Sequence, residues 1–238
     1  MKAMKSLVLM IMCSMLLASC NRINPLNDCP PNTIIEWVDL LMIGDIKYEH
    51  HFPEPAHENT PITIEKGKEL GKVTYRMADS ACSNHKMQNG HAAFLTEGTR
   101  IYEIKGYPSA LMVVADDVVY VASENKHAKT AGDLYPIDQL VKNIHIESTE
   151  DGTRMHTFSQ ASVDQFIAAF TKLKLQDVQS LNKAGKLDGT RIFLDIELNN
   201  GVSFRQLYWM DSNVFHDGAI GNDEIKAIIN DELAQMGK

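Results

Sequence analysis

The sequence predicts an α+β protein in which a small all-β domain, a barrel or a sandwich, precedes an antiparallel sheet with two amphipathic helices. Three observations lead to this fold class. The first half contains short apolar or alternating runs between turn residues and has no sustained helical period. The second half alternates such runs with two stretches of helical spacing. A content of 44% hydrophobic and 23% charged residues is typical of a folded domain.

Composition divides the chain into five segments. We predict a signal peptide at 1–19, a lipidated tether at 20–32, a β-rich domain at 33–123, a linker at 124–140 and an α+β domain at 141–238. The tether is rich in proline and asparagine, which favours an extended spacer. The linker is placed where the sequence lacks an apolar period.

Strands of the first domain are predicted where short apolar runs end at turn residues. They are 33–38, 40–43, 46–48, 71–77, 93–95, 99–105, 111–115 and 118–121. Gly44 and the pair Asp116-Asp117 are the expected tight turns between neighbouring strands. The stretch 50–61 contains three prolines and is expected to be a surface loop, because proline is excluded from central strands.

The second domain is expected to alternate strands with helices. Its predicted strands are 141–147, 153–158, 191–198 and 202–209. Asn200-Gly201 between the last two is the strongest hairpin pattern in the chain. Ser159 is the expected N-cap of one helix, and a second helix is expected to start near Asn222. Both helices carry one apolar stripe, which predicts that they cover one face of the sheet.

The N-terminus has the pattern of an exported protein. Lys2 and Lys5 precede an eleven-residue apolar run, 7–17, and no acid lies among these residues. A helix of that length spans about 16 Å, roughly half the hydrocarbon core of a bilayer. A signal peptide is therefore predicted rather than a membrane-spanning helix.

The apolar run ends in Leu17-Ala18-Ser19-Cys20, which resembles the lipobox of bacterial lipoproteins at all four positions. The resemblance implies that the Cys20 thiol receives a diacylglyceryl group, with palmitate-like chains, and becomes the mature N-terminus. Two acyl chains anchor a protein stably in a bilayer. The implied location is the extracytoplasmic face of the cell membrane. An ordinary secretory peptide, with Cys20 as a free or disulfide-bonded thiol, is the alternative.

A second resemblance covers most of the mature chain. The stretches 68–75, 89–95 and 98–107 resemble uncharacterised lipoproteins of Gram-positive spore-forming bacteria. The shared pattern consists of turn and strand residues rather than catalytic groups. It implies a location and carries no activity with it.

The remaining cysteines, Cys29 and Cys82, could form a disulfide, since an exported protein meets an oxidising compartment. Closing a loop of about 50 residues stabilises a fold by roughly 4 kcal/mol in the chain-entropy model. Two unpaired thiols are the alternative. A loose metal site is a further hypothesis: Cys82, His85 and His91, joined by His50 or His51, would suit Zn²⁺ or Cu²⁺.

No catalytic residue and no cofactor is predicted. The chain has no G-x-S-x-G elbow, no P-loop and no C-x-x-C motif. Asp195 and Glu197 have the spacing of a glycosidase pair along one strand, but they alternate with apolar residues, which favours a solvated sheet face. The segment 211–218 resembles a calcium loop but lacks two of its ligand positions. An aromatic binding face formed by tyrosines of the first domain stays open; these are Tyr102, Tyr107 and Tyr120.

A formal charge of −8, from 23 basic and 31 acidic residues, excludes a general nucleic-acid binder. The predicted function is that of a membrane-anchored extracytoplasmic lipoprotein with a non-enzymatic binding or accessory role at the cell envelope. Its candidate partners besides the bilayer are an envelope protein or the cell wall. The alternatives are a metal-binding lipoprotein and an envelope hydrolase.

Overall fold

The computed structural model describes residues 36–50 and 62–236. The chain divides into two units. The larger unit, Trp37–Asp79 with Lys86–Lys238, contains both β-sheets. Of the smaller unit, Met1–Glu36 with Ser80–His85, the structure describes Glu36 and residues 80–85.

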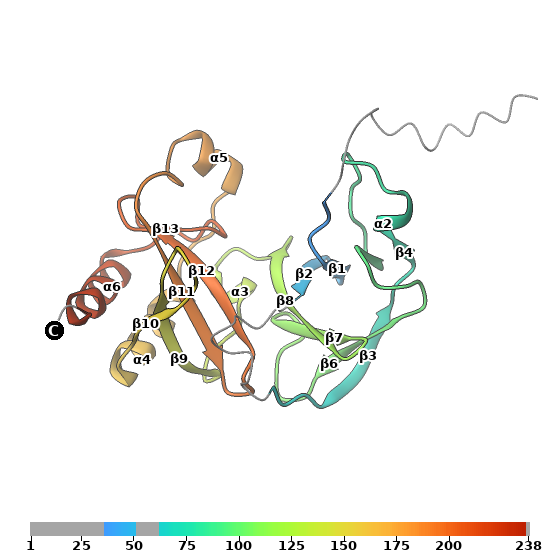
Figure 1. The fold of residues 1–238 in the computed structure, drawn as a ribbon, viewed down its shortest axis with the longest axis horizontal. Coiled ribbons are helices and arrows are strands. Elements are labelled where there is room, and N and C mark those ends of the chain that lie inside the picture. The colour runs from blue at the N-terminus through green and yellow to red at the C-terminus, as the bar shows by residue number, and fades with distance from the viewer. Residues whose placement is uncertain (1–35, 51–61, 237–238) are drawn as a thin grey trace, which may run out of the picture. The chain divides into compact units, whose positions relative to one another are not determined.

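The first sheet has eight strands in the order β3-β6-β7-β8-β2-β1-β5-β4 (Figure 1). The strands are β1 (Leu40–Ile43), β2 (Ile46–His50), β3 (Lys66–Lys72), β4 (Tyr75–Arg76), β5 (His91–Ala92), β6 (Arg100–Ile104), β7 (Met112–Ala115) and β8 (Val118–Asn125). Among the described strands of this sheet, β4 and β5 are the only pair that runs parallel. Register shifts between β2 and β8 and between β3 and β6 bend the strands, and the sheet curls into an open half-barrel.

Two of its hairpins turn where the sequence predicts. Gly44 and Asp45 join β1 to β2 with φ of 60° and 62°, and Asp116 and Asp117 join β7 to β8 with φ of 51° and 61°. Positive φ at both central positions is the geometry of a type I′ turn, which matches the twist of paired strands. Aspartate tolerates this conformation better than most residues because its side chain bonds locally.

The second sheet has five antiparallel strands in the order β10-β9-β11-β12-β13. They are β9 (Val141–Glu147), β10 (Arg154–Thr157), β11 (Arg191–Leu198), β12 (Ser203–Trp209) and β13 (Val214–Phe215). Gly201 has a φ of +86° in the β11–β12 hairpin, as the Asn200-Gly201 pattern predicts. In its register Asp195 of β11 lies between His145 of β9 and Arg205 of β12.

Two amphipathic helices cover one face of the second sheet (Figure 1). Helix α4 (Gln160–Phe170) begins after the N-cap Ser159, and α6 (Asp223–Gln235) begins after the N-cap Asn222. The short helices are α2 (Met77–Ser80), α3 (Ala131–Leu134) and α5 (Val178–Lys183). Among the described residues, no helix has the length and hydropathy needed to cross a membrane. The predicted α+β fold is confirmed.

Helix α6 carries a carboxylate on its buried side. Glu232 is fully buried; its Oε2 lies 2.5 Å from Nε2 of His156 in β10, and its Oε1 accepts a hydrogen bond of 3.1 Å from the Ser159 backbone N–H. One side chain therefore ties the last helix to an edge strand and to the start of α4. Burial would raise the pKa of Glu232, but hydrogen bonds from Ser162, His156 and Ser159 lower it.

The segment expected to be a linker, 124–140, contributes to the core. It contains the end of β8 and helix α3, where Thr130 and Asp133 form a capping box. Leu134, Tyr135 and Ile137 are all buried. The predicted domain boundaries stay a prediction, since the described core is one hydrophobic cluster with residues of both sheets.

Phe166 of α4 lies at the centre of this cluster. Its ring packs against Phe158, Phe170 and Phe215, with centroid distances of 6.0, 5.4 and 6.2 Å. Edge-to-face and stacked contacts of this kind add to the free energy gained from burial.

We predict that Phe166→Ala lowers the free energy of unfolding by about 3–5 kcal/mol, because it leaves a cavity under α4. The exposed Val178→Ala is the control and should change this free energy by less than about 0.5 kcal/mol. Urea unfolding followed by circular dichroism measures both. A loss of less than about 1 kcal/mol in Phe166→Ala would show that α4 does not cover the core.

Candidate functional site

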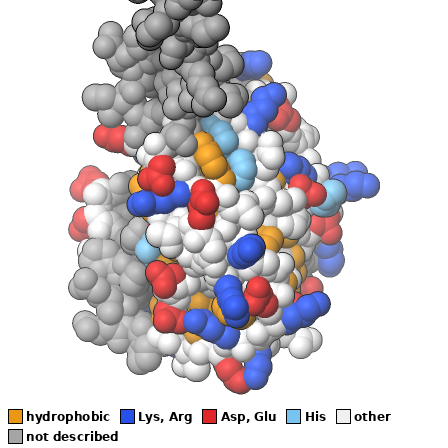
Figure 2. Space-filling model, turned by 90° about the vertical axis from the view of Figure 1, so that its right-hand side faces the viewer, with side chains coloured by type: hydrophobic (Ala, Val, Ile, Leu, Met, Phe, Trp, Pro, Cys, Tyr) orange, Lys and Arg blue, Asp and Glu red, His pale blue; other side chains and the backbone are white. Residues whose placement is uncertain are grey.

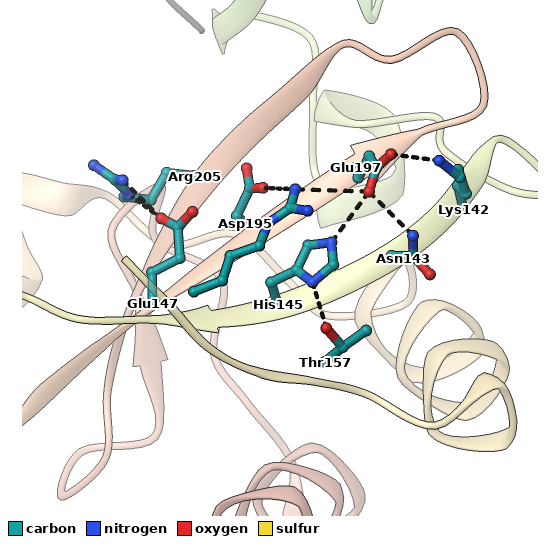
Figure 3. A network of polar contacts seen from close by, with 9 residues as sticks. Lys142, Asn143, His145, Glu147, Thr157, Asp195, Glu197 and Arg205 are labelled. Atoms are coloured by element: carbon teal, nitrogen blue, oxygen red, sulfur yellow. Dashed lines mark hydrogen bonds and ion pairs between the residues drawn. The ribbon is translucent and has the colours of Figure 1, made fainter. Parts of the chain in front are cut away.

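Polar side chains gather on the face of the second sheet that points away from α4 and α6. They come from three neighbouring strands and are Asn143, His145, Glu147, Asp195, Glu197, Ser203 and Arg205. Four of them are almost fully buried, with exposed fractions of 3% for His145, 2% for Glu147, 2% for Asp195 and 5% for Glu197. Figure 3 shows how they meet across the strands.

The expectation of a solvated face for Asp195 and Glu197 is therefore wrong. The alternation in the sequence correctly separates these carboxylates from the apolar side of β11, but it carries no information about what covers the other side. Basic and amide groups of β9 and β10 lie within bonding distance of both carboxylates and compensate for the loss of water around them.

Glu197 is the centre of the network. Its Oε1 accepts a hydrogen bond of 2.8 Å from Lys142, and its Oε2 accepts bonds of 3.0 Å from Asn143 and 3.1 Å from Nε2 of His145. Burial alone would raise the pKa of Glu197, but these hydrogen bonds outweigh it and lower the pKa to about 2. The carboxylate is ionised at every physiological pH.

His145 is held at both ring nitrogens. Its Nδ1 lies 2.8 Å from the hydroxyl of Thr157, and its Nε2 lies 3.1 Å from Glu197. Burial lowers the pKa of His145 and outweighs the Glu197 hydrogen bond, which raises it. The ring is then neutral, and its hydrogen bonds assign the proton to Nε2, since the ionised carboxylate can only accept.

Hydrogen bonds connect a hydroxyl, an imidazole and a carboxylate in a row: those of Thr157, His145 and Glu197. This is the meeting of a histidine with a carboxylate that the hydrolase alternative requires. A hydrolase also needs a cavity at the hydroxyl where a substrate carbonyl can bind. The pocket next to this network is lined by Asp195, Ser203 and Arg205 of the network, whereas Thr157, His145 and Glu197 are not among its lining residues.

Two arginines neutralise the remaining carboxylates. Arg205 donates from Nε and Nη2 to Oε2 of Glu147, at 2.9 and 2.6 Å, while its guanidinium lies 4.6 Å from the centre of the Phe193 ring. Arg154 donates to Asp195 over 3.2 Å. Removing one partner of such a buried pair is costly because it leaves an uncompensated charge.

A half-open pocket of about 300 Å³ adjoins the network. The side chains that define its chemistry come from β2, β11, β12 and the loops before β9 and α6. They are Glu49, Tyr135, Asp195, Phe204, Arg205 and His216. Its volume is at the lower end of the range for small-molecule sites in proteins. The network thus forms part of the wall of a cavity.

His216, one of two histidines that line the pocket, is neutral for a structural reason. The backbone N–H of Leu207 in β12 donates to Nδ1 of His216 over 3.3 Å. The imidazole nitrogen thus accepts a bond that a backbone carbonyl of a neighbouring strand would otherwise accept. A nitrogen that accepts this bond cannot carry a proton, which leaves the proton on Nε2. Burial lowers the pKa of His216 further, against the neighbouring carboxylates of Asp217 and Glu49.

Tyr135 has ring contacts with two phenylalanines, one of β12 and one of α4. Its ring stacks on Phe204 with a centroid distance of 4.9 Å and lies 6.4 Å from Phe170. Burial raises the pKa of the Tyr135 phenol well above its ordinary value, and the carboxylates of Asp217 and Glu49 raise it further. The hydroxyl therefore stays protonated.

The cysteines and histidines singled out in the sequence lie elsewhere. Cys82 is disulfide-bonded, so its sulfur is not a free thiolate for a metal. Cys20, Cys29 and His51 lie outside the described residues, and the pairing of Cys29 with Cys82 stays a prediction. Within 36–50 and 62–236, no group of three or more His, Cys, Asp or Glu side chains is placed to hold a metal ion.

His85 and His91 have local contacts. The backbone N–H of His85 donates to the carbonyl of Cys82 over 2.9 Å. Nδ1 of His91 accepts from the backbone N–H of Gln88 over 3.3 Å, and its ring centre lies 4.9 Å from that of Tyr75.

The prediction that Tyr120 contributes to an aromatic binding face is wrong. This side chain is 1% exposed, and its hydroxyl lies 3.3 Å from both carboxylate oxygens of Asp39. Tyr102 and Tyr107 are partly buried against the same core. Figure 2 shows acidic and basic side chains interspersed on one face of the molecule, and among its described residues no broad apolar patch.

The calcium-like segment 211–218 consists of two turns with the short strand β13 between them, and it precedes α6. Asn213 has a φ of +54°; its side chain accepts from the hydroxyl of Tyr208 over 2.8 Å and donates to the backbone carbonyl of Asn222 over 3.1 Å. The amide that a cation would need is used to hold the start of the helix.

Of the pocket residues, Asp195 and His50 are candidates in the sequence, for a carboxylate pair and a metal site, but nothing in the sequence indicates the pocket itself. Glu49, Tyr135, Phe204 and His216 come from four separate segments and belong to no motif. A weak local pattern exists only for Tyr135, which follows the capping box of α3. No protein-family model, no curated protein and no solved structure matches this chain.

We predict that the Glu197 carboxylate stabilises the folded protein at neutral pH and that this stabilisation is lost at acid pH. Its pKa is about 2 in the folded protein against an ordinary value of 4.5, so the stabilisation is complete above about pH 4.5 and is lost as the pH falls towards 2. The quantity to compare is the free energy of unfolding of wild type minus that of Glu197→Gln. This difference should be larger at pH 6 than at pH 2 by about 3 kcal/mol.

Urea unfolding at a series of pH values measures this difference. The exposed Glu97→Gln serves as the control, and its difference from wild type should stay constant with pH. A constant difference between wild type and Glu197→Gln from pH 6 to pH 2 would contradict the network described here.

Proposed function

We propose that the chain is an extracytoplasmic lipoprotein, held at the cell membrane through a diacylglyceryl group on Cys20, with a binding or accessory role at the envelope. The observation that carries the proposal is the tetrapeptide 17–20 directly after a short apolar run and a basic N-terminus. A diacyl anchor is retained by the bilayer far more strongly than a single chain.

One feature of the described residues supports this proposal. The disulfide at Cys82 fits an oxidising compartment, because structural disulfides persist outside the cytosol and are rare within it.

Mass spectrometry of protein purified from membranes tests the anchor. Trypsin cleaves after Lys5 and Arg22, so a processed and acylated chain yields the tripeptide Cys20-Asn21-Arg22 with a diacylglyceryl group. We expect this tripeptide from wild type and from Cys13→Ser, the matched control inside the leader. Cys20→Ser should give neither the tripeptide nor the lipid mass.

An unmodified peptide 6–22 as the main N-terminal product of wild type would contradict the proposal. An unacylated Cys20 at a free N-terminus would contradict it equally, since it would indicate an ordinary secreted protein.

A further inference from the structure

The pocket beside the network has one acidic group without a counter-ion. Arg205 is matched by Glu147, and Asp195 is matched by Arg154. Glu49, at the exposed rim, has no ion pair within the described part of the chain. His50, which also lines the pocket, faces Asp39, with 3.0 Å between its Nδ1 and the Asp39 Oδ2. Because His216 is neutral, Glu49 supplies the charge of the lining that no neighbour balances.

The carboxylate of Glu49 lies close to the other polar groups of the pocket. Its field raises the pKa of both Tyr135 and His216, although burial is the larger influence on each. The phenol of Tyr135 and the Nε2–H of His216 are donors, and the hydroxyl of Ser203 adds a group that donates or accepts. Besides the ion-paired Asp195 and Arg205, the lining thus combines the unbalanced carboxylate of Glu49 with several neutral hydrogen-bonding groups.

One part of the wall is apolar. Phe204, Val121 and Ala122 line the pocket together with the polar groups, which include His50 and Ser123. At roughly 30 Å³ for each water-sized group, its volume accommodates about ten non-hydrogen atoms. An aromatic ring beside a carboxylate is a favourable environment for an organic cation. A hydrated inorganic ion would gain less from such walls than a small molecule with a short carbon chain.

We propose that this pocket binds a small molecule that carries a primary ammonium group on a short, partly apolar body. The ammonium pairs with the carboxylate of Glu49, the carbon chain lies along Phe204 and the alanine and valine of β8, and a polar far end bonds with the hydroxyl and imidazole groups. The inference deepens the binding role proposed above and rests on it, but it does not depend on the lipid anchor.

Isothermal titration calorimetry on the full chain in neutral detergent, at about 150 mM NaCl to screen surface attraction, tests this with three probes of matched length. They are 5-amino-1-pentanol, 1,5-pentanediol and 5-hydroxypentanoate, which are cationic, neutral and anionic. We expect the amine to bind with a Kd of about 1 mM or below and the other two at least about tenfold more weakly.

Glu49→Gln should weaken binding of the amine about tenfold and leave binding of the diol unchanged. Glu97→Gln removes another exposed carboxylate, in the turn between β5 and β6, and should leave binding of the amine unaffected. Near-UV circular dichroism checks that both variants keep the wild-type fold.

Three results would overturn the inference. They are no binding of the amine at about 10 mM, equal binding of the diol or the acid, and an equal loss in Glu49→Gln and Glu97→Gln, which would indicate attraction to the acidic surface as a whole. None of these results bears on the proposed lipid anchor, because mass spectrometry detects the Cys20 tripeptide independently of any ligand.

Discussion

The ionised carboxylate of Glu197 beneath the surface of the second sheet is the constraint on which the rest of the structure depends. A charge in a poorly solvated position is tolerated only when hydrogen bonds and counter-charges replace water. Lys142, Asn143 and His145 supply that replacement from the neighbouring strand. The register of β9 against β11 is therefore fixed by polar contacts on one face and by the apolar core on the other. A slip of one residue would place the carboxylates against the helices and the isoleucines against the network.

The same pairing determines the electrostatics of the pocket. Asp195 and Arg205 face each other across β11 and β12, yet each has its ion pair with a different residue, Arg154 and Glu147 respectively. Their charges are balanced within the sheet. Glu49, which comes from the first sheet, supplies the charge that is left over. The network thus affects ligand choice indirectly: because its charged groups are paired with each other, they are not available to pair with a ligand.

Much of the fold could be predicted because it is specified locally. The Asn200-Gly201 turn, the N-caps Ser159 and Asn222 and the apolar stripes of α4 and α6 each lie within a few residues of sequence. The burial of Asp195 and Glu197 could not be predicted, because alternation separates two faces without indicating what covers them. The pocket escaped prediction for a related reason: Glu49, Tyr135, Phe204 and His216 converge only through tertiary packing. The segment 124–140 has polar composition at its start, which concealed the buried Leu134, Tyr135 and Ile137 at its end.

Glu197 is a buried, ionised carboxylate held by its neighbours. An NMR titration that follows the side-chain carboxyl carbon of Glu197 in the folded protein measures its pKa directly. We expect a pKa of about 2 for this group. A value near 4.5, the ordinary value for glutamate, would contradict it, because it would mean that the carboxylate is solvated and that the polar face of the second sheet is open to water.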